Sequence, residues 1–166
     1  MSQANSREIV LLGITTVTTS GTGADTNMIM AWQAGTITLN VATVSGTLPT
    51  LDVYIQKKLG QAAAADVNPG PPTGTAIYDD LLHFTQLTTS TTVRLANVVT
   101  AAIGISTVAT PTITAPADYA QSDAALAAGT LRMGPLSGIW RVKYVISGTT
   151  PSIAFSVVAQ LNPFST

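Results

Sequence analysis

The sequence predicts an all-β protein: a two-sheet antiparallel β-sandwich, of jelly-roll or immunoglobulin-like type, with long loops and an N-terminal arm. Three observations predict it. Apolar and polar residues alternate with a period of two in several segments, threonine occurs 27 times in 166 residues, and a ten-residue pattern rich in turn formers occurs twice. A chain of this length suits one domain. We therefore expect residues 1–27 to form an arm or first strand, and residues 28–166 to form the sandwich.

The alternation marks the strands. It is strongest in four segments, 36–44, 51–56, 140–146 and 153–158. In the first of them Ile37, Leu39 and Val41 share one face, opposite threonines and an asparagine, as in a strand that is buried on one side. Weaker strands are expected near 8–19, 28–33, 77–87, 91–95 and 98–109.

The repeated pattern reads VSGTLPTLDV at 44–53 and ISGTTPSIAF at 146–155. Each copy lies between two alternating segments, so we predict that each is the loop of a β-hairpin, spanning 36–56 and 139–160. The similarity over ten aligned positions is explained equally well by an old duplication and by structural pseudo-symmetry. Either origin favours an antiparallel sandwich.

Glycine and proline give each predicted loop its turn chemistry. Gly46 and Gly148 can take a positive φ without a Cβ clash. Pro49 and Pro151 fix φ, bias the residue before them toward extended geometry, and suit the first position of a strand because they have no N–H. We expect these four residues to be structural turn residues.

Two segments interrupt the strands. Residues 60–75 are rich in proline and glycine, and 116–130 predict a short helix or coil with Asp118 or Ser122 as N-cap and Gly129 past its end. Both are expected at the surface, either as binding loops or as tolerated insertions.

The sequence offers little chemistry. His83 is the sole histidine, no nucleophile motif accompanies it, and a structural role is the simpler interpretation. Asp79 and Asp80 are adjacent, so on a strand they point to opposite faces and do not converge on one metal ion. A calcium site shared with Asp66 or Asp52 is the alternative. There is no cysteine and no cofactor-binding motif, so we expect neither an enzyme, nor a cofactor, nor a metal site.

Charge is scarce. Charged residues make up 9% of the chain, against roughly 25% in typical domains. The seven lysines and arginines are scattered, so no basic stripe for nucleic acid is expected. The apolar run Ile9–Leu12 is too short for a membrane span, which favours a product made in the cytoplasm. Such an uncharged surface suits burial against other chains, although threonine and serine also solvate extracellular β domains.

Aromatic residues allow two interpretations. Trp32 and Trp140 are expected to be core residues or anchors of an interface. The alternative is a carbohydrate- or receptor-binding module that stacks sugars on Trp32, Tyr54, Tyr78 or Tyr119.

Three stretches carry a family resemblance: TLDVYIQ at 50–56, IYDDLLHFTQL at 77–87, and GIWRVKYVISGTTPSIAFSVVAQL at 138–161. In order and spacing they resemble small β-sandwich structural proteins of tailed bacteriophages. The resemblance covers about half of the chain, and its motifs specify a fold and carry no active site. It implies a virion protein of the head decoration, neck or tail.

These observations together favour a capsid decoration, or cement, protein. Copies are expected to form homo-oligomers, trimers being favoured, and to bind the major capsid protein or other virion proteins on the outer face of the head. The expected location is the capsid surface of a virion assembled in the bacterial cytoplasm. A neck, tail or fibre component of the same virion is the closest alternative.

Overall fold

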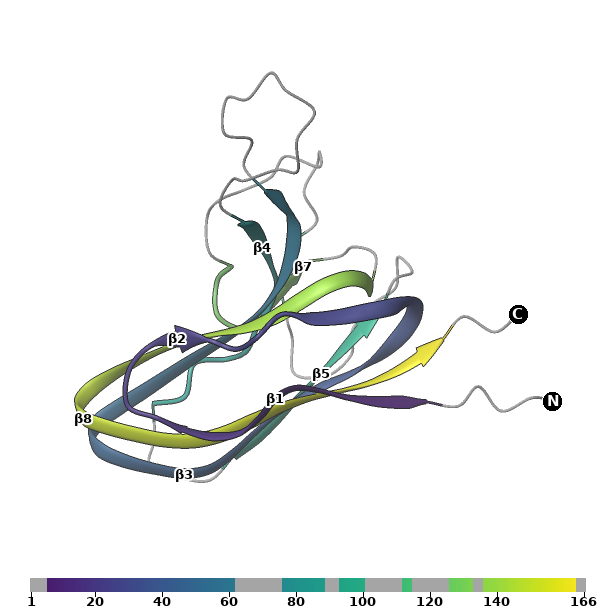
Figure 1. The fold of residues 1–166 in the computed structure, drawn as a ribbon. Helices are drawn as coiled ribbons and strands as arrows, with labels where there is room; N and C mark the ends of the chain where they lie inside the picture. Colours follow the sequence, from purple (N-terminus) through teal and green to yellow (C-terminus); the bar gives the residue numbers. More distant parts are fainter. Residues whose placement is uncertain are drawn as a thin grey trace, which may run out of the picture.

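The computed structural model describes residues 6–61, 76–88, 93–100, 112–114, 126–132 and 136–163. The described part is all-β and contains no helix, so the all-β part of the prediction is confirmed, and the strands belong to one hydrogen-bonded sheet (Figure 1). Its strands are β1 (Arg7–Val17), β2 (Gly21–Thr22), β3 (Thr26–Gln61), β4 (Ala76–His83), β5 (Val93–Thr100), β6 (Thr112–Thr114), β7 (Thr130–Arg132) and β8 (Leu136–Pro163).

Two long strands, β3 and β8, organise the fold through two long ladders, and the start of β3 adds a short one, in which residues 26–28 pair with residues 140–138. As β3 advances from Thr36 to Val41, its partners in β8 fall from Gln160 to Phe155. Further along β3, positions 51–57 pair with positions 146–140 in the same descending order. Both ladders are therefore antiparallel, and they use opposite halves of the two strands.

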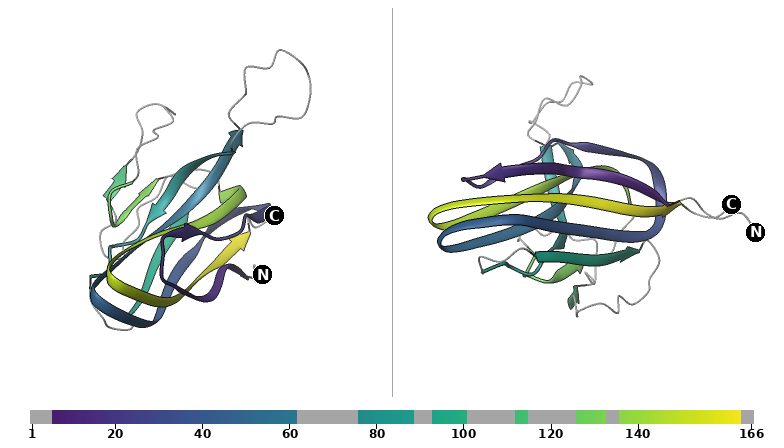
Figure 2. Two further views of the ribbon diagram at one scale, coloured as in Figure 1. Left: turned by 60° about the vertical axis from the view of Figure 1, so that its left-hand side comes forward. Right: turned by 90° about the horizontal axis from the view of Figure 1, so that it is seen from below.

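The two ladders lie in two stacked layers (Figures 1 and 2). The β5 layer contains β1, residues 152–163 of β8, residues 34–45 of β3, and β5. The β4 layer contains β2, residues 136–147 of β8, residues 50–61 of β3, and then β4, β7 and β6. Hydrogen bonding is continuous from one layer to the other through β3 and β8.

Both long strands change layer at the repeated sequence pattern, so the predicted hairpins are wrong. Segments 36–44 and 51–56 pair with β8 and not with each other, and the two copies of the pattern pair across the ribbon, with Thr47 opposite Thr149. The hydroxyls of Thr50 and Ser147 add a hydrogen bond of 2.6 Å between them. Each copy is thus a corner, at which a strand leaves one layer and enters the next (Figure 2).

The corners have the same backbone conformation. Gly46 and Gly148 have φ of +113° and +114°, and the residues before the prolines, Leu48 and Thr150, have φ of 49° and 47°. The expectation that proline keeps the preceding residue extended is therefore wrong at both positions. Proline disfavours the right-handed helical region for that residue, so a chain that must turn sharply there adopts the left-handed one.

The glycines explain why the pattern occurs twice. A Cβ on Gly46 would lie 2.9 Å from Cα of Pro151, and a Cβ on Gly148 would lie 2.7 Å from the carbonyl oxygen of Leu48. Each corner therefore needs a glycine so that the backbone of the other corner can approach. The two copies form one reciprocal unit.

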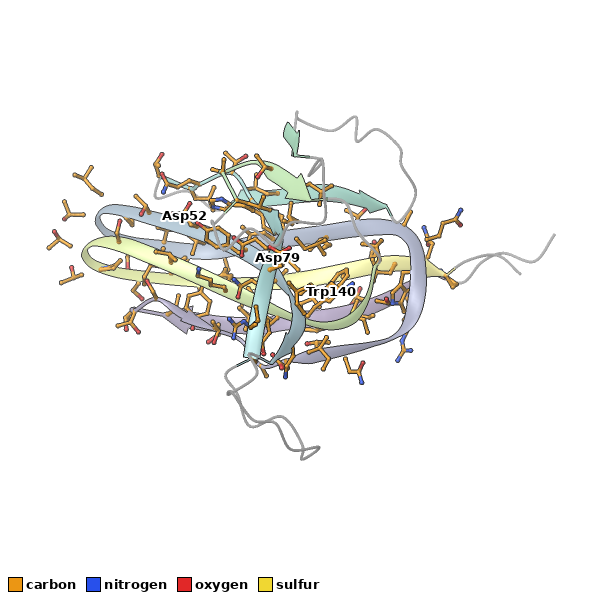
Figure 3. All side chains as sticks on the ribbon, turned by 90° about the horizontal axis from the view of Figure 1, so that it is seen from above. Asp52, Asp79 and Trp140 are labelled. Atoms are coloured by element: carbon orange, nitrogen blue, oxygen red, sulfur yellow. The ribbon has the colours of Figure 1, made fainter. Side chains whose placement is uncertain are left out.

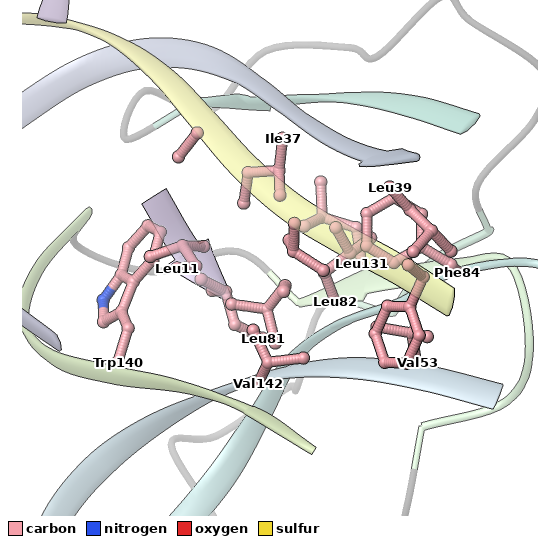
Figure 4. Packing of buried hydrophobic residues seen from close by; sticks show 14 of the residues in the cluster. Leu11, Ile37, Leu39, Val53, Leu81, Leu82, Phe84, Leu131, Trp140 and Val142 are labelled. Atoms are coloured by element: carbon pink, nitrogen blue, oxygen red, sulfur yellow. The ribbon is translucent and has the colours of Figure 1, made fainter. Parts of the chain in front are cut away.

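The predicted apolar faces form a single hydrophobic cluster between the layers. Ile37 and Leu39 of the β5 layer lie toward Val53 and Val142 of the β4 layer (Figure 4). At the N-terminal end, β1 pairs with β8 from Arg7 onward and contributes to the same cluster, so this first strand belongs to the sheet.

Some expectations fall outside the described residues. Residues 62–75, 101–111 and 115–125 are not described, and they include most of the proline-rich segment and most of the predicted helix. The part of 116–130 that is described contains a turn, with Gly129 at φ +73°, that leads into β7.

Candidate functional site

Polar and charged side chains gather on the outer face of the β4 layer. Because Leu51, Val53 and Ile55 of β3 point into the core, alternation turns Asp52, Tyr54 and Gln56 toward the opposite face of the layer. Figure 3 labels Asp52 on this strand. The facing strands supply the partners of these side chains. The result is two connected groups, one around His83 and one around Asp80.

His83 is held on both of its ring nitrogens. Nδ1 lies 2.7 Å from the carbonyl oxygen of Leu126, and Nε2 lies 3.0 Å from Oδ1 of Asp52. The imidazole stacks on the ring of Tyr54 at 3.8 Å between centroids, and Gln86 donates to the other oxygen of Asp52 at 2.6 Å. The histidine thereby ties β3, β4 and the segment before β7 together.

This geometry favours the structural interpretation of His83. The side chain is only 4% exposed, and both nitrogens face acceptors within the protein. A general base needs a nitrogen within reach of the proton that it removes. In this arrangement neither nitrogen is open to a nucleophile.

Asp80 is the centre of the second group and is also buried, at 6% exposed. Its Oδ1 accepts from Nε2 of Gln56 at 2.8 Å, and its Oδ2 accepts from the backbone N–H of Leu126 at 3.0 Å. Gln56 has its orientation set by Arg141, whose Nε donates to the amide oxygen at 2.8 Å. A buried carboxylate is thus satisfied on both oxygens.

The group continues to the edge of the layer. The guanidinium of Arg141 lies 3.3 Å from the ring centroid of Tyr78, whose hydroxyl donates to the carboxylate of Asp25 at 2.7 Å. Lys58 completes an ion pair with the same carboxylate at 3.5 Å. Sequence reasoning missed Gln56 and Arg141, although a glutamine and an arginine on the polar faces of two predicted strands are a usable signal.

Three pKa values on this layer are shifted. Burial raises the pKa of Tyr54, and the carboxylates of Asp52 and Asp80 raise it further. Burial, and then the hydrogen bond to Asp25, raise the pKa of Tyr78. Burial lowers the pKa of Lys57.

The aspartates do not assemble a metal site in the described part of the chain. Asp52 and Asp80 already accept hydrogen bonds on both oxygens, and Asp79 has an interaction partner of its own. No group of three or more His, Cys, Asp or Glu residues converges there. Asp66, the other carboxylate considered, lies outside the described residues.

The two tryptophans are buried, and two of the tyrosines considered above pack against a neighbouring side chain. Trp32 and Trp140 belong to the hydrophobic cluster, so in this fold they are core residues and not surface anchors. Tyr54 lies under His83 and Tyr78 lies under Arg141. Tyr119 is outside the described residues.

The outer face of the β5 layer contrasts with the β4 layer. Its two central strands lie within segments 26–51 and 144–163, which contain no Asp, Glu, Lys or Arg. Three pairs of neighbours form the middle of this face: Thr36 with Gln160, Thr38 with Val158, and Asn40 with Ser156. We call these six residues the neutral face.

No helix in the described ranges has the length and hydropathy needed to cross a membrane. Comparison of this chain with protein-family models, curated proteins and solved structures gave no match.

Proposed function

We propose that this protein is a structural component of a tailed-phage virion, a decoration (cement) protein that assembles on the outer face of the head. The observation that carries the proposal is the neutral face, a central stretch of sheet without charged residues. Isolated soluble domains protect such surfaces with charge, whereas assembly subunits cover them with neighbours.

In this proposal the two layers act as a β-sandwich, of jelly-roll or immunoglobulin-like kind, that presents large faces to its partners. Covering apolar and threonine-rich area contributes about 25 cal/mol per Å² of apolar surface, less the cost of ordering. The partners are other copies of this chain and the major capsid protein. Each added copy stabilises the shell by bridging neighbouring subunits.

The polar groups of the β4 layer support a structural role and not a chemical one. The side-chain oxygens of Asp52, Asp80 and Gln56 and both nitrogens of His83 are engaged within the chain. These contacts join strands to each other, which is what a structural role requires. The ring of Tyr54 stacks against His83, and one face of the Tyr78 ring lies against the guanidinium of Arg141, which leaves less ring surface for stacking a sugar.

The test is to add the purified protein back to heads that lack it and to follow heat release of DNA. We expect the protein to bind and to raise the temperature at which the heads open. Heads that neither bind the protein nor gain heat resistance would contradict the decoration role. Binding to isolated tails or necks in place of heads would favour the neck, tail or fibre alternative.

A further inference from the structure

The neutral face lies between two rims. On one side β1 adds Val10, which pairs with Val158 and is 54% exposed. On the other side β5 pairs with β3 along eight residues. Together with β1 and β5, the neutral face forms the four-stranded outer face of the β5 layer, whose centre is made of hydroxyl, amide and aliphatic side chains.

Charge appears only at the rims of this surface. Glu8 of β1 pairs with Gln160, and Arg94 of β5 occupies the register position beside Asn40. The two positions lie on opposite edge strands and differ in sign. Arg7 lies beside Glu8 on the same edge strand, β1. The charged side chains described around His83 and Asp80 belong to the β4 layer or its edge.

The size of this four-stranded outer face limits what it can bind. Four strands about 4.8 Å apart, each about eight residues long at about 3.3 Å per residue, cover about 500 Å². Two such faces bury about 1,000 Å² together, which is the lower limit for a specific protein interface. A contact of this size suits an assembly in which neighbours are already concentrated.

The chemistry of the face selects its occupant. A charged partner surface would lose its hydration there and find no counter-charge in the centre. The face of a second copy is uncharged in the same region and equal in extent. A sheet face that meets its own copy does so about a two-fold axis, because both copies offer the same patch.

We propose that the neutral face is a self-association surface, which docks on the neutral face of a second copy to form a two-fold dimer. This inference rests on the proposed function, since it names the contact between copies in the assembly. The face is a better candidate than the outer edge of β1, because two register shifts interrupt the pairing of that strand and such bulges discourage edge-to-edge association.

The experiment is sedimentation equilibrium of the full chain over a hundredfold range of concentration. Val158→Lys places a charge in the middle of the neutral face, and Val145→Lys places the same charge on the β4 side of the same strand, where Val145 is 38% exposed. We expect a monomer–dimer equilibrium in the natural protein. Val158→Lys should raise its dissociation constant at least about 100-fold, because two lysines would meet without a counter-charge. Val145→Lys should leave the constant within about twofold.

Circular dichroism and thermal melting of both variants ensure that a loss of dimer is not a loss of fold. Thr38→Lys, opposite Val158 in the ladder, repeats the test from β3. A dimer or trimer that resists both Val158→Lys and Thr38→Lys would overturn the inference and leave the decoration role standing. A chain that stays monomeric at every concentration would also overturn it, and binding to heads would then decide the proposed function separately.

Discussion

Replacing Gly148 with alanine tests the reciprocal corners most sharply. The new Cβ would lie 2.7 Å from the carbonyl oxygen of Leu48 and 2.9 Å from that of Thr47, and both atoms belong to the backbone of the other corner. Alanine would also have to adopt φ +114°, a region that side chains rarely occupy. Backbone strain of this kind costs about 1–3 kcal/mol. Overpacking against immobile atoms adds about 1–3 kcal/mol.

The expected loss of unfolding free energy is therefore about 2–6 kcal/mol, a large part of the stability of a single domain. For a chain of this size it corresponds to a fall in melting temperature of about 10 °C. Urea denaturation gives the free energy, and calorimetry gives the melting temperature. Gly13→Ala is the matched control, because a Cβ there meets nothing within 4 Å, and it should change stability by less than about 0.5 kcal/mol. If Gly148→Ala is as harmless as Gly13→Ala, the corners do not pack as described.

Three further predictions follow from the corners and from the β4 layer. Asp80→Asn should lower the unfolding free energy, measured in urea, by about 1–3 kcal/mol, because the new side-chain NH2 group would point at a hydrogen-bond donor, either Nε2 of Gln56 or the backbone N–H of Leu126. An unchanged urea midpoint would contradict the buried network. Leu48→Asn should raise the unfolding free energy by about 0.5 kcal/mol, because Leu48 is 81% exposed with φ of 49° and asparagine tolerates the left-handed backbone region better than leucine does. Destabilisation would count against a left-handed conformation at this position. With respect to Tyr54, the free energy of unfolding should be constant below pH 10 and should fall above it, because burial raises the pKa of this tyrosine above its ordinary 10.0 and the unfolded chain therefore ionises first. Urea midpoints between pH 8 and pH 11 should fall less in Tyr54→Phe than in the natural protein. An equal fall in both proteins would exclude Tyr54 as a cause.

Local periodicity was sufficient to predict the strands and their buried faces. Ile37, Leu39 and Val41 alternate with polar residues, and each is buried in the structure. The pattern identifies which side of a strand is buried, because side chains alternate across a sheet regardless of which strand lies beside it. Strand type and inward face were therefore predictable from neighbouring residues alone.

Strand pairing was not predictable in the same way. A glycine and a proline between two alternating segments suit both a hairpin loop and a corner between layers. The difference lies in contacts between residues about a hundred positions apart, such as Thr47 with Thr149. The repetition of the pattern was the sequence signal that the two segments contact each other. Two segments that pack reciprocally have the same steric requirements, here a glycine at the point of close approach.

The polar groups of the β4 layer were predictable only in part. His83 could be named as structural because nothing in the sequence accompanied it as a nucleophile. Its partners Asp52 and the carbonyl of Leu126 come from positions 31 and 43 residues away, so no local pattern connects them. The tryptophans were undecided between core and interface, and only the packing of the layers places them inside.

The central claim is that this chain works as a repeated subunit of a viral particle. The most direct measurement is the number of copies per purified virion, obtained by quantitative mass spectrometry against the major capsid protein. The decoration role predicts a fixed ratio to that protein, amounting to hundreds of copies in each particle. Absence of the chain from purified virions, or an irregular trace amount, would contradict the claim.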